Sequence, residues 1–190
     1  MTIAKIVSGG QTGADRGGLD AALYCDVPHG GWCPKGRKAE DGRIPAKYTL
    51  REMPSADYLA RTEANVVDSD ATLVFTEKAA TGGSLRTLEF CRKHGRPWHE
   101  VTLASTRREK AVKDITAWLA GDPAFNDYED YEARPPEPCI LNVAGSRGSK
   151  SPGIADAVEA IMVDVLIAVN PDCRKFYPQD GPKRKNGAKT

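Results

Sequence analysis

The sequence has almost no net charge. Lysine and arginine together number 27 against 26 aspartate and glutamate residues in a chain of 190. The protein as a whole therefore has no electrostatic field that would attract nucleic acid or an anionic membrane, and we expect neither as a partner. Any binding site for an anion must instead be built locally.

Long hydrophobic runs are also missing. No apolar stretch approaches the roughly 18 residues that a membrane helix needs. The first eight residues run straight into a strand pattern, without a basic region or a small-residue cleavage site. These absences predict a cytoplasmic protein.

Cysteines are few and scattered. There are five, an odd number, and no C-x-x-C pair occurs, which argues against a disulfide framework and a cysteine-rich zinc site. The histidines form no metal-binding pair. We expect reduced, mostly buried thiols and no directly bound metal. For Cys33, which lies beside basic residues, burial is favoured over a role as a low-pKa nucleophile or soft metal ligand.

What the sequence does contain is an alternation of short apolar runs with longer segments of helical period. This pattern is typical of an α/β fold, here a Rossmann-like three-layer parallel sheet with helices on both faces. Residues 1–170 fit a single domain, and the basic extension at 171–190 is expected to be partly disordered. The predicted strands are 3–7, 29–33, 71–75, 98–103 and 139–144, and the predicted helices are 14–25, 58–68, 84–94, 108–120 and 153–168.

Two polar segments interrupt the alternation. Residues 34–57 are rich in proline and glycine and are long for a structureless connection, so we expect a functional loop or a lid. Residues 122–138 are acidic and proline-rich, which favours a solvated spacer over a site.

A glycine-rich turn, Ser-Gly-Gly-Gln-Thr-Gly-Ala-Asp at 8–15, directly follows the first predicted strand. Its glycines let the backbone approach a ligand, and the amides at the next helix start carry partial positive charge, so a phosphate needs no lysine there. The turn lacks both the P-loop ending and the dinucleotide G-x-G-x-x-G spacing, which disfavours ATP and NAD in their usual modes. The expected ligand-binding residues are Gly9, Gly10, Gln11, Thr12, Gly13, Asp15 and Arg16.

Two more turns of this kind follow predicted strands, at 81–87 and 144–153. Tight packing would explain any one of these turns by itself. Because the carboxyl ends of parallel strands meet at one edge of a sheet, the three turns together predict a shared pocket for a phosphorylated small molecule. The expected ligand-binding residues in these two turns are Gly82, Gly83, Ser84, Thr87, Gly145, Ser146, Arg147 and Lys150.

Charged residues in the loop at 31–45 are candidates for the same pocket. Lys35 or Arg37 could pair with a phosphate. Glu40 or Asp41 could bind sugar hydroxyls or act as a general acid or base. A solvated surface loop is the alternative for each of these side chains.

Arg61 and Asn65 lie four residues apart on a predicted helix and therefore share one face. They could close over a ligand at the sheet edge. An ion pair for Arg61 and a turn cap for Asn65 are equally compatible with the sequence.

Several motifs, in order from about residue 6 to 160, together resemble one family. They are Ser-Gly-Gly-Gln-Thr-Gly-Ala-Asp-Arg, Gly-Trp-Cys-Pro-Lys-Gly-Arg, Ala-Glu-Asp-Gly-x-Ile-Pro, Arg-Thr-x-x-Asn-Val, Thr-Gly-Gly-x-x-x-Thr and Leu-Asn-Val-Ala-Gly. The chain resembles the family called putative molybdenum carrier proteins, the circularly permuted YpsA branch of the SLOG superfamily. The resemblance implies a Rossmann-like fold that binds the molybdenum cofactor or a nucleotide-derived ligand, as a carrier or a sensor. Related proteins often assemble, so a homo-oligomer is expected.

The segment from Thr81 to Glu89 is also similar to the P-G-G-x-G-T-x-x-E signature of LOG enzymes, which release a base from nucleoside monophosphates. Thr81 replaces the proline, Arg86 replaces the third glycine and Glu89 stands one position early. The alternative function is therefore a nucleotide N-glycosidic hydrolase. In that case Glu40, Asp41 or Glu89 would activate water or stabilise an oxocarbenium-like centre.

Overall fold

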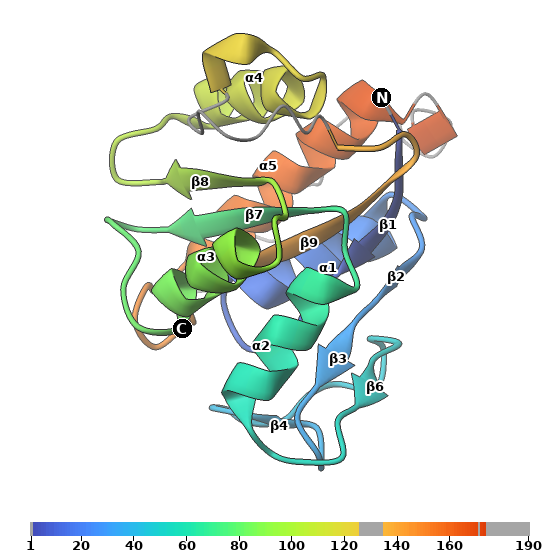
Figure 1. Cartoon of the computed structure of the whole chain (residues 1–190), viewed down its shortest axis with the longest axis vertical. Helices are drawn as coiled ribbons and strands as arrows, with labels where there is room; N and C mark the ends of the chain where they lie inside the picture. The colour runs from blue at the N-terminus through green and yellow to red at the C-terminus, as the bar shows by residue number, and fades with distance from the viewer. Residues whose placement is uncertain (1, 126–134, 171, 174–190) are drawn as a thin grey trace, which may run out of the picture.

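A sheet of five parallel strands forms the centre of the molecule (Figure 1). The computed structural model describes residues 2–125, 135–170 and 172–173, so the C-terminal extension, apart from residues 172 and 173, and most of the acidic spacer lie outside the described residues. The strands have the order β2-β1-β9-β7-β8. They are β1 (Ile3–Val7), β2 (His29–Gly30), β7 (Ala71–Thr76), β8 (Trp98–Thr102) and β9 (Cys139–Gly145).

Helices cover both faces of this sheet. In Figure 1, α2 (Tyr58–Val67) and α3 (Gly83–Lys93) lie in front of it, and α1 (Ala14–Tyr24) and α5 (Ile154–Val169) lie behind. α4 (Arg108–Leu119), which precedes the short helix η1 (Pro123–Phe125), packs against α5. Strand β7 is buried along its whole length because it is covered on both faces. The predicted α/β fold with a parallel sheet is confirmed.

β9, a late strand in the sequence, lies in the middle of the sheet. It pairs with β1 on one side and with β7 on the other. This order places the glycine-rich turn that follows β9 between the turns that follow β1 and β7. The sheet topology therefore brings three segments that are far apart in the sequence to one edge.

The expected single strand over residues 29–33 is corrected by the structure. It is divided at Gly31 into β2, which pairs with β1, and β3 (Trp32–Cys33), which pairs with β6 (Arg51–Glu52). Gly31 has a φ of +120°, and an added Cβ would lie 2.3 Å from the carbonyl oxygen of Ser8. Glycine at this position lets the chain pass close to Ser8 and bend out of the main sheet. Ser8 stands more than twenty positions earlier in the sequence.

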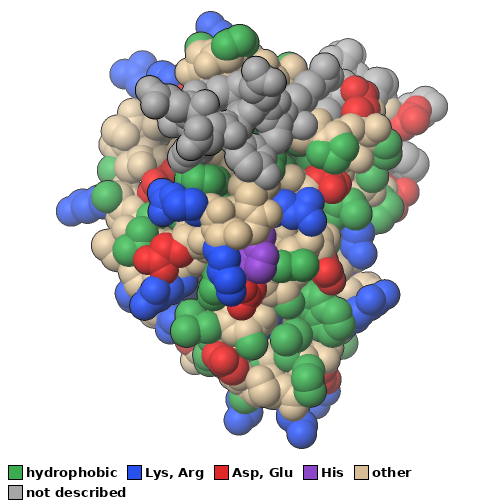
Figure 2. All heavy atoms as spheres, viewed as in Figure 1, with side chains coloured by type: hydrophobic (Ala, Val, Ile, Leu, Met, Phe, Trp, Pro, Cys, Tyr) green, Lys and Arg blue, Asp and Glu red, His purple; other side chains and the backbone are tan. Residues whose placement is uncertain are grey.

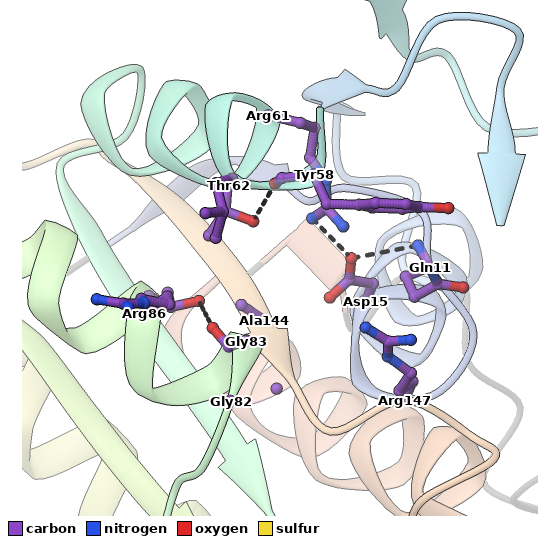
Figure 3. A pocket seen from close by; sticks show the side chains of 13 residues that line it. Gln11, Asp15, Tyr58, Arg61, Thr62, Gly82, Gly83, Arg86, Ala144 and Arg147 are labelled. Carbon is purple, nitrogen blue, oxygen red and sulfur yellow. Dashed lines mark hydrogen bonds and ion pairs between the residues drawn. The ribbon is translucent and has the colours of Figure 1, made fainter. Parts of the chain in front are cut away.

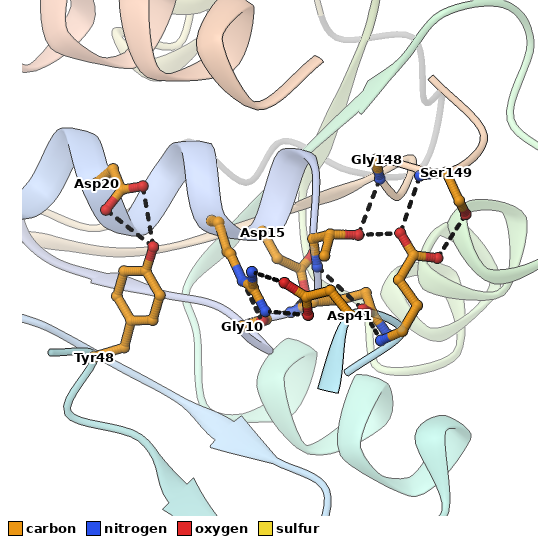
Figure 4. Close-up of polar contacts among 11 residues, drawn as sticks. Gly10, Asp15, Asp20, Asp41, Tyr48, Gly148 and Ser149 are labelled. Atoms are coloured by element: carbon orange, nitrogen blue, oxygen red, sulfur yellow. Dashed lines mark hydrogen bonds and ion pairs between the residues drawn. The ribbon is translucent and has the colours of Figure 1, made fainter. Parts of the chain in front are cut away.

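A small second hydrophobic cluster lies beneath the loop at 34–45, which we call the β4–β5 loop after its hairpin of β4 (Lys38–Ala39) and β5 (Gly42–Arg43). The phenol of Tyr48 is buried there and donates to the Asp20 carboxylate at 3.0 Å (Figure 4). The loop is therefore packed onto α1. The cluster consists of Leu19, Cys33, Ile44 and Tyr48.

All five cysteines are free and buried, which confirms the expected burial. Burial raises the pKa of Cys25 and of Cys139 to about 12, and that of Cys91 to about 11. Burial also raises the pKa of Cys33, although nearby arginines oppose the shift. A thiol with a raised pKa is a poor nucleophile at neutral pH, so the low-pKa interpretation of Cys33 is not supported.

Acidic and basic side chains are mixed over the face of the molecule that Figure 2 shows, as the near-zero net charge suggests. Within the described ranges, no helix has both the length and the apolar character that crossing a membrane requires.

Candidate functional site

The turns that follow β1, β7 and β9 meet at a cleft of about 280 Å³ (Figure 3). α2 forms the wall opposite the turns, and α3 begins at the edge of the cleft with Gly82 and Gly83. Gly82, which precedes α3, provides no side-chain cap. The start of α3, where the helix dipole is positive, is therefore presented to the cleft without a side-chain cap and without an acidic residue in its own first turn.

An ion pair between Asp15 and Arg61 forms the floor of the cleft. Asp15 Oδ2 lies 3.2 Å from Arg61 Nη1 and accepts a hydrogen bond of 3.2 Å from the backbone N–H of Gln11. The two charged side chains are only 7% and 10% exposed. Burial raises the pKa of Asp15, and the charge and hydrogen bonds of Arg61 and the backbone oppose this shift.

The guanidinium of Arg61 lies against the backbone of Gly9. A Cβ added at Gly9 would lie 1.7 Å from Arg61 Nη1, so a side chain there would displace the guanidinium. Arg61 Nε is buried and has no hydrogen-bond partner among the described residues. An unsatisfied buried donor of this kind costs roughly 1–3 kcal/mol, and more when it is charged. An oxygen atom from a bound ligand would remove that cost.

Arg147, from the loop after β9, reaches the cleft, whereas the side chain of Arg86 on α3 extends away from it (Figure 3). Arg86 Nη1 also pairs with Glu89 at 2.5 Å, on the exposed side of the helix. Asp15 is the acidic side chain among the described residues that line the cleft. Because Arg86 is paired with Glu89 outside the lining, the cleft itself holds the guanidinium groups of Arg61 and Arg147 against the carboxylate of Asp15, which leaves an excess of positive charge.

Glu40, in the β4–β5 loop, connects the first turn to the third through Thr12 and Ser149. Its carboxylate accepts hydrogen bonds from Ser149 N at 3.0 Å and Ser149 Oγ at 2.6 Å, and a short one from the Thr12 hydroxyl. Burial acts to raise the pKa of Glu40, but the hydrogen bonds from Ser149 and Thr12 outweigh it and hold the pKa below its ordinary value. Glu40 therefore holds two walls of the cleft together as a carboxylate.

Asp41 and Arg37 hold the same loop in place. Asp41 is bound by both terminal nitrogens of Arg16, at 2.5 and 2.8 Å, which lowers the pKa of Asp41. Arg37 adopts a φ of +53°, and its guanidinium is surrounded by backbone acceptors. It donates to the carbonyl oxygens of Ile44, Pro45, Tyr48 and Leu50 at 2.9 to 3.3 Å.

Asn65, on α2, supports strand β3. Its side-chain amide accepts from Trp32 N at 2.7 Å and donates to Trp32 O at 3.0 Å, like a neighbouring strand. Asn65 and Arg61 were expected to share a face of one helix, and the structure gives them different partners because Arg61 extends into the cleft.

The expected ligand-binding residues thus fall into two groups. Those that line the cleft are Gln11, Asp15, Arg61, Gly82, Gly83, Thr87, Gly145 and Arg147. Those outside its lining are Gly9, Gly10, Thr12, Gly13, Arg16, Lys35, Arg37, Glu40, Asp41, Asn65, Ser84, Ser146 and Lys150, together with the candidate catalytic residue Glu89.

Five residues in the lining were not among the ligand-binding residues expected from the sequence: Tyr58, Leu59, Thr62, Arg86 and Ala144. Tyr58 stands three residues before Arg61 on the same helix, so helical spacing places both side chains on one face. This spacing is the sequence signal that could have identified Tyr58. Arg86 stands where the LOG signature has its third glycine. The sequence comparison therefore treated it as a departure from that signature and not as a candidate ligand-binding residue.

The described residues contain no group of three or more His, Cys, Asp and Glu side chains arranged to hold a metal ion. The cleft that they do form joins guanidinium groups to a helix start at the carboxyl edge of a parallel sheet.

This fold and this cleft define a Rossmann-like α/β protein with a cleft at the carboxyl edge of its sheet. Residues 6–166 match the model of the circularly permutated YpsA SLOG family, and the chain belongs to that family. It is similar to a crystal structure, at 1.45 Å resolution, described as a putative molybdenum carrier protein from Syntrophus aciditrophicus SB. That chain is 40% identical, with a TM-score of 0.75, over 87% of this chain and 96% of that one. Comparison with curated proteins gave no match.

Proposed function

We propose that this protein binds a phosphorylated small molecule, the molybdenum cofactor or a nucleotide-derived compound, in the cleft at the carboxyl edge of the sheet. It would act as a carrier or a sensor of that molecule. The observation that carries the proposal is the buried guanidinium of Arg61, whose Nε has no partner among the described residues and which lies in the cleft. The name of the similar crystal structure supports the choice of ligand class.

A phosphate fits the charges that surround this position. Arg61 and Arg147 provide more positive charge than Asp15 neutralises, and the uncapped start of α3 adds its dipole. A phosphomonoester carries about −1.5 to −2 charges at neutral pH and offers three acceptor oxygens. One of these oxygens would accept from Arg61 Nε, and the others would accept from Arg147 and from the backbone N–H groups at the start of α3.

The molybdenum cofactor is compatible with this donor set through its phosphate. Arg61, Arg147 and the start of α3 would hold the phosphate. The cofactor's own sulfur atoms would supply soft ligands for the metal, a role that suits thiolates and not the guanidinium groups of the cleft.

The hydrolase alternative depends on a free carboxylate near the ligand. The structure places its three candidates outside the cleft lining: Glu40 with Ser149, Asp41 with Arg16, and Glu89 with Arg86. These contacts favour binding without turnover. We expect no free adenine when the protein is incubated with adenosine 5′-monophosphate; release of adenine would support the hydrolase instead.

Calorimetry with adenosine 5′-monophosphate and with inorganic pyrophosphate tests the proposal. Arg147→Gln should weaken the binding of both compounds about ten-fold or more, since a charged hydrogen bond contributes roughly 1.5–3 kcal/mol. Arg92→Gln, on the exposed last turn of α3, is the matched control and should bind like the wild type. The proposal fails if neither compound binds the wild type, or if Arg147→Gln binds as well as Arg92→Gln.

A further inference from the structure

An exposed aromatic ring lies at the mouth of the cleft. Tyr58, the first residue of α2, lines the cleft and keeps 40% of its surface exposed. Arg61 stands three residues later, so the two side chains lie on the same face of the helix, separated by a rise of about 4.5 Å along its axis. Figure 3 shows the ring of Tyr58 beside the Arg61 guanidinium, on the side toward Gln11.

The backbone under this ring is fixed. Asp57, the N-cap of α2, accepts a hydrogen bond of 2.8 Å from Leu59 N. The Thr62 hydroxyl donates to the carbonyl oxygen of Tyr58 at 2.8 Å. The first turn of α2 is therefore capped, and a ligand that contacts the ring need not order the helix first.

The mouth of the cleft also carries an exposed apolar side chain beside this ring. Leu59, which follows Tyr58 on α2, lines the cleft and is 47% exposed. Tyr58 and Leu59 therefore leave apolar surface in water next to the charged groups of the cleft. A ligand that matches both parts has an anionic end and a flat apolar end.

We propose that the cleft selects a phosphate that is joined to a planar heterocycle, and that Tyr58 is the residue that recognises the ring by stacking. This inference rests on the proposed function, because it assumes that the phosphate binds at Arg61. It adds what the charges alone do not specify, namely that a sugar phosphate or inorganic phosphate would bind more weakly than a nucleotide or a pterin phosphate.

The test compares adenosine 5′-monophosphate with ribose 5-phosphate, which has the same phosphate and sugar but no ring system. Stacking of a base on an aromatic side chain should make the nucleotide bind roughly ten-fold tighter to the wild type. Tyr58→Ala should remove that preference and leave the affinity for ribose 5-phosphate unchanged. Tyr58→Phe, which keeps the ring, should retain the preference.

Tyr24→Ala is the matched control, because Tyr24 is also 40% exposed but lies at the end of α1 outside the cleft lining. The inference is overturned if the wild type binds both compounds equally, which would leave the phosphate site intact. It is also overturned if Tyr58→Ala changes the sedimentation of the protein but not the ratio of the two affinities, because Tyr58 would then belong to an interface between copies of the chain. If neither compound binds, the proposed function itself fails.

Discussion

The β4–β5 loop and the floor of the cleft are both rich in charge, but they differ in how fully their charged groups are satisfied. In the loop, Arg37 donates to four carbonyl oxygens, and Glu40 accepts from both the amide and the hydroxyl of Ser149. On the floor, Arg61 has one ion pair to Asp15, while its buried Nε has no partner among the described residues.

This difference separates groups that hold the structure from groups that are available to a ligand. A charged side chain whose hydrogen bonds are all made by the protein has nothing left to offer, whereas a buried unsatisfied donor is stable only if something else compensates it. The pKa shifts agree with this division. Burial raises the pKa of Asp15, and hydrogen bonds lower the pKa of Glu40 and of Asp41.

The largest effect is expected at the floor. Arg61→Met leaves the Asp15 carboxylate buried without its counter-charge, and the free energy of unfolding should fall by about 3–5 kcal/mol. Urea denaturation measures this loss. The double variant Asp15→Asn/Arg61→Met removes both charges and should recover most of the stability. A single variant as stable as the wild type would show that the pair is not the buried unit that the distances indicate.

A smaller effect is expected in the loop. Arg37→Lys replaces a planar group with five donors by one ammonium, which cannot reach all the carbonyls that Arg37 binds. The free energy of unfolding should fall by roughly 1–3 kcal/mol.

The affinity of Arg37→Lys for adenosine 5′-monophosphate should stay unchanged, as calorimetry can show. If the affinity falls while the stability is kept, Arg37 contacts the ligand, as the sequence analysis proposed, and the comparison between loop and floor is wrong.

Most of the fold could be predicted from local patterns. Apolar strand-length runs and helical periods are properties of neighbouring residues, and they located the strands of the sheet to within a few positions. The division at Gly31 could not be predicted, because it depends on the approach of Ser8 from another strand. Glycine is compatible with both a straight and a bent chain, so the sequence alone does not choose between them.

The site was predictable where a residue's role follows from its place in a turn, as for Gln11 and Arg147. The site was harder to predict where the only argument was the charge of a side chain. Arg37 and Arg61 are both arginines near the same edge, and only their tertiary surroundings show that one is saturated by carbonyls and the other is not. Tyr58 was missed because exposure of an aromatic side chain is likewise a property of the folded chain.

The smallest effect concerns Glu40 and is set by pH. Because the folded protein holds the pKa of Glu40 below its ordinary value of 4.5, its hydrogen bonds add stability above that value and lose it as the pH falls through the lowered pKa. The contribution should be under about 1 kcal/mol, since the carboxylate is exposed to solvent. The amide signal of Ser149, followed by NMR, should titrate with a midpoint below 4.5. Glu40→Gln should abolish that titration. A midpoint at or above 4.5 would mean that the hydrogen bonds of the folded protein do not favour the ionised form of Glu40, and the contrast with the floor would then rest on the arginines alone.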